Sequence, residues 1–370
     1  MVQSFDVLVR GAGAVGQALA LTLGRLGLAV ALRDEAPAAR AGDDVRAFAL
    51  NAASMALLRD LRVWEALPAQ AVTAVHQMQV RGDARDARLE FTAWQQHVGA
   101  LAWIVDAQAL ERELQAALRF APHVTRVDAD VSATLTALCE GKASATRAAM
   151  GVEVERIDYG QQAIAARLDA ARDHQNVAHQ WFRSPDVLAL LPLDAPQHHA
   201  SYALVWSCPD ERARQLLALE PGAFEAQIAL ATAGEVGGLT LCSPRAGWPL
   251  TLAQAHPWCG PGWVLLGDAA HVVHPLAGQG LNLGFADVAA LGRVIATREA
   301  WRRLDDPRLL RRYVRERQSP TWAMGRVTDG LLQLFARPEP AARELRNRGM
   351  TLLNHLPPLK RWLNARAIDS

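Results

Sequence analysis

A glycine-rich turn near the start of the chain constrains the fold more than any other feature. The apolar run Phe5–Arg10 predicts a buried strand, and it leads directly into Gly11-Ala-Gly13-Ala-Val-Gly16 and an Ala- and Leu-rich segment that predicts a helix to about Gly24. A second predicted strand, Ala29–Leu32, is followed by Asp34. A strand, a GxGxxG turn, a helix, a strand and an acidic residue in this order are typical of a dinucleotide-binding unit.

Each position of this unit has a physical task. Gly11 permits the tight turn, Gly13 lets the backbone approach a pyrophosphate, and Gly16 allows the helix to pack closely on the sheet. The N–H groups and positive dipole end at the start of the helix favour phosphates, and Asp34 can accept hydrogen bonds from an adenosine ribose. The cofactor-binding residues expected here are Gly11, Gly13, Ala14, Val15, Gly16 and Asp34. The unit alone does not distinguish NAD from FAD.

A second glycine-rich segment lies far downstream, between Gly260 and Asp287. Trp263–Leu266 predicts a buried strand that ends at Gly267-Asp268. A loop with a proline and glycines follows, and Leu283–Ile295 predicts a helix. A carboxylate at the end of a strand, followed by a glycine loop and a helix N-terminus, indicates a second turn that contacts the cofactor. The helix dipole would there stabilise negative charge on a bound ring.

Two features admit more than one interpretation. His271 and His274 have a spacing that suggests a metal site, but a proline follows His274 and no carboxylate is placed as a third ligand. We therefore favour a loop histidine bonded to backbone groups, and expect no metal. Arg10 stands at the end of a buried strand, where it is either a surface residue or a second phosphate contact.

Composition excludes several classes of protein. With 39 Lys and Arg against 38 Asp and Glu, the chain lacks the basic excess of a nucleic-acid-binding protein. The four cysteines are scattered without metal-ligand spacing, which indicates reduced thiols in a cytoplasmic protein. The first residues lack the pattern of a signal peptide. The basic amphipathic stretch Ala341–Ala367 suits either peripheral contact with an anionic inner membrane or packing on the rest of the chain.

Six tryptophans in or beside predicted strands are expected to pack in the core or between domains: Trp94, Trp103, Trp181, Trp206, Trp248 and Trp263. Among them, Trp181, Trp206 and Trp248 are also candidates for the wall of a substrate pocket.

Three segments together resemble the class A flavoprotein aromatic hydroxylases, and more narrowly the ubiquinone-biosynthesis hydroxylases of the 2-polyprenylphenol hydroxylase type. The residues that carry the resemblance are Gly11-Ala-Gly13-Ala-Val-Gly16, Asp34, Asp44-Val-Arg46-Ala-Phe-Ala-Leu-Asn51, Gly267-Asp268-Ala-Ala-His271 and His274-Pro275-Leu-Ala-Gly278-Gln279-Gly280-Leu281-Asn282-Leu-Gly284-Phe-Ala-Asp287. The last run is the most specific of them.

The resemblance implies an α/β fold in which a Rossmann-like FAD-binding domain is interleaved with a mixed β-sheet substrate domain. The FAD-binding parts would be 1–72, 99–150 and 255–325, the sheet parts 73–98 and 151–254, and a helical C-terminal tail 326–370. Strands of the sheet domain are expected at Val75–Arg81, Ala87–Phe91, Gly151–Tyr159, Gln162–Leu168, Asn176–Phe182, Val187–Leu193 and Ser201–Trp206.

The resemblance also implies FAD as the cofactor and assigns residues to it. Arg46 would contact the phosphates, Asp268 the ribityl chain, and Gln108 would add a ribityl contact at the start of a helix. The rest of the cofactor-binding set is Gly267, Pro275, Gly278, Gly280, Leu281 and Asn282. Four loop residues would lie at the reacting centre: His274, Pro275, Gly278 and Gln279.

The implied activity is hydroxylation of the aromatic ring of a ubiquinone precursor, a polyprenylphenol. Reduced flavin and O2 would form a C4a-hydroperoxide, whose distal oxygen is transferred to the ring. Two alternatives stay open: hydroxylation of a small soluble phenol, and a non-catalytic flavin-binding accessory protein of a quinone-biosynthesis complex. In the run Leu138–Arg147, Glu140 stands where the family's GADGxxSxxR motif has Asp, and the hairpin expected before it is short. NAD(P)H is therefore only one possible electron donor.

Overall fold

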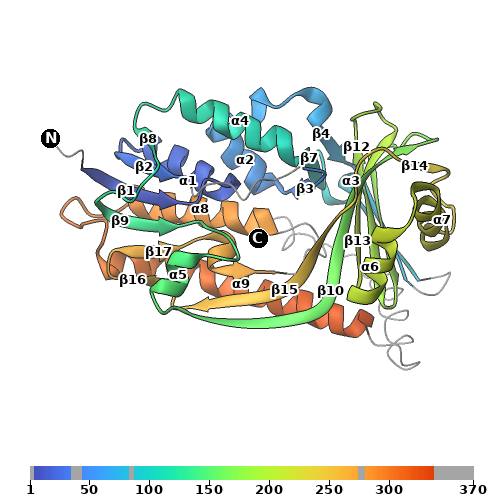
Figure 1. The fold of residues 1–370 in the computed structure, drawn as a ribbon. Coiled ribbons are helices and arrows are strands. Elements are labelled where there is room, and N and C mark those ends of the chain that lie inside the picture. The colour runs from blue at the N-terminus through green and yellow to red at the C-terminus, as the bar shows by residue number, and fades with distance from the viewer. Residues whose placement is uncertain (1–3, 35–43, 83–86, 274–279, 337–370) are drawn as a thin grey trace.

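The structure is a computed structural model that describes residues 4–34, 44–82, 87–273 and 280–336. Its described part contains a six-stranded, a nine-stranded and a three-stranded sheet. Figure 1 shows the six-stranded sheet with its helices at one end of the molecule and most of the nine-stranded sheet at the other. The interleaved α/β architecture expected from the sequence is confirmed.

The six-stranded sheet forms the first layer. Its order is β16-β17-β9-β1-β2-β8, and its pairs are parallel except β16 with β17. The strands are β1 (Phe5–Arg10), β2 (Val30–Arg33), β8 (Val124–Val127), β9 (Ala133–Leu138), β16 (Cys259–Gly260) and β17 (Trp263–Leu265). Helices α1 (Ala14–Arg25), α4 (Ala107–Arg119) and α8 (Gly280–Ala296) pack around it. Buried aliphatic residues from these elements make the largest core cluster.

The nine-stranded sheet is mostly antiparallel, with one parallel pair between β11 and β5. Its strands are β5 (Gln77–Arg81), β6 (Arg88–Thr92), β10 (Glu153–Ala170), β11 (Val177–Arg183), β12 (Asp186–Leu193), β13 (Ser201–Pro209), β14 (Leu239–Leu241), β15 (Ala246–His256) and β18 (His271–Val272). Helices α6 (Asp210–Ala218) and α7 (Pro221–Thr232) bury one of its faces, where Ile164, Leu204 and Phe224 pack together. The opposite face is partly covered by the three-stranded sheet, where Ala178, Leu193 and Ala203 pack with Val75 and Ile104.

Two strand predictions were wrong. Gly151–Tyr159 and Gln162–Leu168 are not separate strands: they belong to the single strand β10, whose register against β15 shifts between Asp158 and Gln162. Val75–Arg81 is not one strand either, because it divides at His76 into β4 (Val72–Val75) and β5. β4 pairs with β7 (Ala102–Asp106), which also pairs with β3 (Ala47–Leu50). This three-stranded sheet was not expected from the sequence.

Shorter elements connect these sheets. They are α2 (Ala52–Asp60), η1 (Trp64–Ala66), η2 (Ala69–Ala71), α3 (Ala93–Gln96), α5 (Ala145–Ala149) and η3 (Gly267–Ala269). The long helix α9 (Pro307–Ala336) runs beneath β15 and packs on α8 (Figure 1). Within the described ranges, no helix combines the length and apolar character needed to cross a membrane. The stretch Ala341–Ala367 lies outside the described residues.

The tryptophan predictions were correct for some positions only. Trp181 and Trp206 are almost fully buried in the nine-stranded sheet. Trp94 is instead 87% exposed, because it lies on the short helix α3 at the surface and not in a strand. Trp248 is half-buried and faces Arg46, which directly precedes β3.

Candidate functional site

The turn after β1 can be made only with glycine at two positions. Gly11 has a φ of +98°, and a Cβ there would lie 2.4 Å from the carbonyl oxygen of Cys139, which directly follows β9. A Cβ on Gly16 would lie 1.8 Å from the carbonyl oxygen of Gly11. The turn, β9 and α1 are thus in direct backbone contact, which brings the start of α1 to the carboxyl ends of the parallel strands.

The space in front of this turn is open. A Cβ on Gly13 would meet no atom within 4 Å, and Gly13 is the N-cap of α1 with no side chain bonded to the first turn. The first turn of α1 also lacks acidic residues, so its N–H groups and dipole face an unfilled space. The Gly11 N–H donates to the carbonyl oxygen of Arg33 at 3.1 Å, which places the exposed Asp34 beside the same turn.

The second glycine segment meets the first one at Val15. A Cβ on Gly284 of α8 would lie 2.6 Å from Cγ2 of Val15, and one on Gly267 would lie 3.4 Å from the same side chain. Two segments that are far apart in the sequence therefore form one site, as their shared pattern predicted. The Val15 side chain packs behind the turn, so only its backbone faces the open space.

Asp268 fits a sugar-binding role. It opens η3, and its burial raises the pKa of its carboxyl group, while the cations of Lys142, His271 and Arg46 act in the opposite direction. Among the described residues, none forms a hydrogen bond with this carboxylate. A half-buried acceptor without a protein donor suits the hydroxyl groups of a ribityl chain.

A buried charge cluster holds the Gly267–Asp268 turn from behind. Asp287 on α8 accepts hydrogen bonds from the Gly267 N–H at 2.9 Å and from Nε of Arg317 at 2.8 Å, and its Oδ2 lies 2.7 Å from Nε2 of His271. Burial acts to raise the pKa of Asp287, but His271 and Arg317 lower it below its ordinary value. The carboxylate therefore stays ionised and fixes the turn. The prediction that His271 bonds backbone groups was wrong, because its ring pairs with this carboxylate.

Arg46 lies between two aromatic rings. Its guanidinium is 5.7 Å from the ring of Phe48 and 5.8 Å from that of Trp248, and its Nη2 donates to Asp44 at 2.6 Å. Asp44 raises the pKa of Arg46, so the group is a permanent cation near Asp268. This geometry leaves it able to bind a phosphate.

The side chain of Asn282 connects neighbouring elements through hydrogen bonds. Its Nδ2 donates to the carbonyl oxygen of Ala49 at 2.8 Å, and its Oδ1 accepts from the Asn51 N–H at 3.1 Å and from Ser54 Oγ at 2.7 Å. These bonds join the start of α8 to β3 and α2. The side chain of Asn282 is thus bonded within the protein, and the contact that the resemblance implies for this segment is through backbone amides, which stays a prediction.

In the segment expected to contact the electron donor, the Glu140 side chain forms hydrogen bonds with other residues of the chain. Glu140 accepts a hydrogen bond from Nε of Arg10 at 2.8 Å and from Thr146 Oγ1 at 2.6 Å, and it also accepts from Ser144. The Arg10 guanidinium pairs with Glu140 and with Asp130. In the described chain between α4 and β9, β8 pairs with β2 and no hairpin occurs.

The remaining predicted residues are placed less centrally or lie outside the described ranges. Gln108 is exposed on the first turn of α4, whose N-cap is Asp106. The loop residues His274, Pro275, Gly278 and Gln279 lie outside the described residues. Val273 and Gly280, which flank this loop, both lie at the site.

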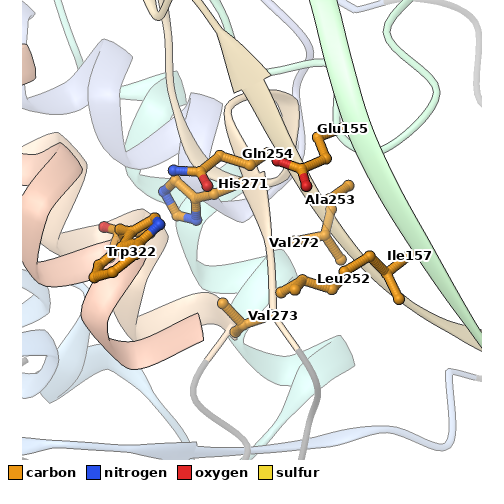
Figure 2. Close-up of a pocket in the computed structure, with 10 residues that line it drawn as sticks. Glu155, Ile157, Leu252, Ala253, Gln254, His271, Val272, Val273 and Trp322 are labelled. Carbon is orange, nitrogen blue, oxygen red and sulfur yellow. The ribbon is translucent and has the colours of Figure 1, made fainter. Parts of the chain in front are cut away.

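A small hollow lies beside β18 and Val273 (Figure 2). It has a volume of about 100 Å³, and Figure 2 shows Trp322 of α9 facing His271 and Gln254 across it. Its apolar wall is made by Ile157, Leu252, Ala253, Val272 and Val273, with Glu155, Gln254, His271 and Thr321 as polar residues. A cavity of about 150 Å³ is needed to hold benzene, so this hollow is too small for a substituted aromatic ring.

Several supporting contacts of the site were not predicted from the sequence. Arg167 of β10 donates to the carbonyl oxygen of Arg46 at 2.5 Å and to Asp106 at 2.7 Å, which joins the nine-stranded sheet to the three-stranded sheet. The one sequence feature that pointed to Arg167 was its charge within an alanine-rich strand. Arg147 donates to the Ala269 carbonyl at 2.6 Å and so holds η3. No local pattern reveals that contact, because its partner comes from a distant segment.

Comparison with known proteins gives one consistent family. A family model described as "FAD binding domain" matches residues 4–121 and 101–328. The chain is 31% identical to 3-demethoxyubiquinol 3-hydroxylase of Escherichia coli, over 97% of this chain and 97% of that protein. It is 30% identical to the ubiquinone hydroxylase UbiL of Rhodospirillum rubrum, over 99% of this chain and 90% of that protein.

Solved structures with the same fold include two proteins from Pseudomonas species. PqsL of Pseudomonas aeruginosa, in complex with 2-aminobenzoylacetate, aligns with a TM-score of 0.77 at 22% identity, over 94% of this chain and 99% of PqsL. The p-nitrophenol 4-monooxygenase PnpA of Pseudomonas putida aligns with a TM-score of 0.76 at 16% identity, over 98% of each chain. At these identities the likeness concerns the fold.

Proposed function

The chain belongs to the FAD-binding-domain family of class A flavin monooxygenases, and from this premise we propose that it hydroxylates the aromatic ring of a ubiquinone precursor. The enzyme class, an FAD-dependent monooxygenase that uses O2, follows from the family and from the named hydroxylase relatives. The observation that carries the substrate proposal is identity of 30% or more, over nearly the whole chain, to two hydroxylases whose names specify ubiquinol or ubiquinone.

The residues present fit FAD. The open space before Gly13 and the N-terminus of α1 would take the pyrophosphate, Asp34 the adenosine ribose, and Asp268 the ribityl hydroxyls. Arg46 would contact the phosphates, and the backbone around Gly280 would face the flavin ring. Bound FAD, once reduced, supplies the activation of O2 and the oxygen transfer. The protein contributes binding, orientation and exclusion of water.

The face of the nine-stranded sheet opposite α6 and α7, where it is not covered by the three-stranded sheet, is proposed to hold the aromatic ring. Arg167 and Trp248 point from this face toward Arg46, and the register places Ala163, Ala165 and Ala189 with Val205 on the same side. Ala189 and Val205 are half-exposed, although both are apolar. Small apolar side chains leave room for a flat ring between the sheet and the cofactor site.

The hollow of Figure 2 is proposed to take part of an apolar tail. It is lined by aliphatic side chains, Val273 forms part of its wall, and it opens toward Ile157 and Trp322, which are 40% and 53% exposed. A prenylated phenol carries such a tail, whereas a small soluble phenol does not. We retain membrane contact through the basic stretch Ala341–Ala367 as part of this proposal, since a prenylated substrate partitions into membranes.

One observation favours a second candidate, a flavin-binding accessory protein without turnover. The Glu140 carboxylate is engaged by Arg10, Ser144 and Thr146, in the segment that would contact a nicotinamide donor. Reduction of the bound flavin by NADH or NADPH distinguishes the two candidates.

Profiling of quinone intermediates in a deletion strain tests the proposed substrate class. We expect the deletion strain to accumulate a prenylated phenol that lacks one ring hydroxyl. Expression of the deleted gene from a plasmid should abolish this accumulation. An unchanged intermediate profile, together with NADH consumption stimulated by simple phenols, would replace the proposal by the soluble-phenol alternative.

A further inference from the structure

A cluster of histidines and carboxylates lies outside the cofactor site, in the turn between β12 and β13. Asp194 directly follows β12, and His198 and His199 come just before β13. We propose that Asp194, His198 and His199 bind a divalent zinc-type cation through one carboxylate oxygen and two imidazole nitrogens. This inference does not depend on the proposed function.

The ligand atoms converge on one point. Nδ1 of His198 lies 3.2 Å from Oδ1 of Asp194, and Nδ1 of His199 lies 3.3 Å from the same oxygen. With metal–ligand bonds of about 2.0–2.1 Å, neighbouring ligand atoms of a tetrahedral zinc ion are about 3.3–3.4 Å apart. The separations of the two Nδ1 atoms from Oδ1 of Asp194 match two edges of such a tetrahedron. All three ligand atoms lie within 4.8 Å of one another.

These contacts are close but are not hydrogen bonds. Asp194 Oδ1 already accepts the backbone N–H of His199 at 2.9 Å, and neither imidazole contact has hydrogen-bond geometry within the described chain. The two ring nitrogens therefore crowd a partly satisfied oxygen without donating to it. A cation between the three atoms would accept all of their lone pairs, which explains the arrangement better than a hydrogen-bond network does.

Neighbouring residues select this set of ligands and orient it. His174 lies nearby, but its Nε2 is 3.1 Å from the Leu193 carbonyl oxygen and its Nδ1 accepts from the Asn176 N–H at 3.0 Å, so both nitrogens are used. Thr73 of β4 donates to Oδ2 of Asp194 at 3.1 Å, which leaves Oδ1 as the ligand atom. Metal ligands in proteins are commonly held by such an outer hydrogen bond.

The site would be open to solvent. The side chains of His198 and His199 are 72% and 47% exposed, and that of Asp194 is 11% exposed. Three protein ligands on an exposed turn leave the fourth tetrahedral position for water. Through Thr73, the bound ion would tie the β12–β13 turn to the three-stranded sheet that begins just after Arg46. Two imidazoles and a carboxylate favour zinc, cobalt, nickel or copper over calcium and magnesium.

Equilibrium dialysis of the untagged, FAD-loaded protein against Zn²⁺ tests the proposal. We expect one zinc per chain in the wild type, and affinity at least about tenfold weaker in His198→Ala. Because His198 is largely exposed, this change leaves the fold intact. Thr73→Val, which removes only the outer hydrogen bond, should weaken binding by about tenfold. His123→Ala, a change at an exposed histidine elsewhere, serves as the matched control and should bind zinc as the wild type does.

Cobalt(II) gives a second readout that does not depend on activity. The wild type should show the intense visible absorption of four-coordinate cobalt, without a thiolate charge-transfer band, and His199→Ala should lose it. Equal zinc uptake by the wild type and His198→Ala, or no uptake by either, would overturn the proposal. A thiolate band would do so too, because it would place the ion at a cysteine such as the exposed Cys242.

Discussion

Oδ2 of Asp287 lies 2.7 Å from Nε2 of His271, and the same oxygen accepts the N–H of Gly267. One buried carboxylate thus fixes both ends of the segment that carries Asp268 and leads into the 274–279 loop. Arg317 from α9 completes the neutralisation of this charge. The turn is therefore held rigid from behind by groups that need not touch the cofactor.

Asp287→Asn should destabilise the protein by about 3 kcal/mol, because it leaves the buried Arg317 without its counter-charge. Urea unfolding at pH 7 measures this. Glu65→Gln removes a partner from the exposed pair with Arg59 and should change stability by less than about 0.5 kcal/mol. Similar losses in the two variants would show that the cluster is not the anchor we describe.

The pH dependence of this variant follows from the lowered pKa of Asp287, which His271 and Arg317 keep ionised. A carboxyl whose folded-state pKa is depressed stabilises the fold above its unfolded pKa of about 3.9, and this contribution is lost as the pH falls through the lower folded value. The stability gap between wild type and Asp287→Asn should therefore be full at pH 7 and close only below about pH 4. A gap that closed near neutral pH would contradict the assignment.

Gly13→Ala should leave the apoprotein stable but weaken FAD binding by about tenfold or more. The new Cβ meets no protein atom within 4 Å, yet it enters the space assigned to the pyrophosphate. Fluorescence titration of apoprotein with FAD, together with thermal unfolding, separates the two effects. Gly222→Ala on α7 also adds a Cβ to open space and should leave FAD affinity unchanged. Wild-type affinity in Gly13→Ala would place the pyrophosphate elsewhere.

Asp268→Asn should affect the stability of the apoprotein and its affinity for FAD in different ways. Because burial raises the pKa of Asp268, the charged carboxylate is unfavourable in the apoprotein at pH 7, so the amide should leave stability unchanged or increase it. Any gain should shrink as the pH falls through the raised pKa, where the wild-type carboxyl becomes neutral. FAD affinity should fall by about tenfold through loss of a charged acceptor. Unchanged affinity would mean that Asp268 does not contact the ribityl chain.

Ala189→Leu should lower turnover of the aromatic substrate without changing FAD content. Ala189 is partly exposed on the face of the nine-stranded sheet opposite α6 and α7 and pairs with Val205, so a larger side chain would occupy the space proposed for the ring. Ala226→Leu on the exposed side of α7 is the matched control. Steady-state rates at saturating FAD compare them. Equal rates would move the ring-binding surface away from this face.

The first glycine unit could be predicted almost residue by residue because its strand, turn and helix are set by local sequence. β1 has the predicted bounds, and α1 ends one residue beyond the predicted Gly24. The glycine at position 160, with a φ of +61°, made a break in β10 look natural. Pairing with β13 and β15 on either side instead carries the strand through it.

The supporting contacts of the site could not be predicted in the same way. Arg10 finds Glu140 130 positions away, and Arg167 finds Asp106 61 positions away. Such partners are chosen by the packing of distant strands, and a single sequence carries no signal of them. Asp287 was visible only as the end of a motif, and its role needed the positions of His271 and Arg317.

The incorporation of oxygen from ¹⁸O2 into a prenylated phenol tests the proposed ring hydroxylation most directly. Purified protein with FAD, chemically reduced under anaerobic conditions, would be mixed with a prenylated phenol and then with ¹⁸O2. We predict a product with one ¹⁸O atom on the aromatic ring, whichever natural donor reduces the flavin. Reoxidation of the flavin with release of labelled hydrogen peroxide and an unchanged phenol would contradict it.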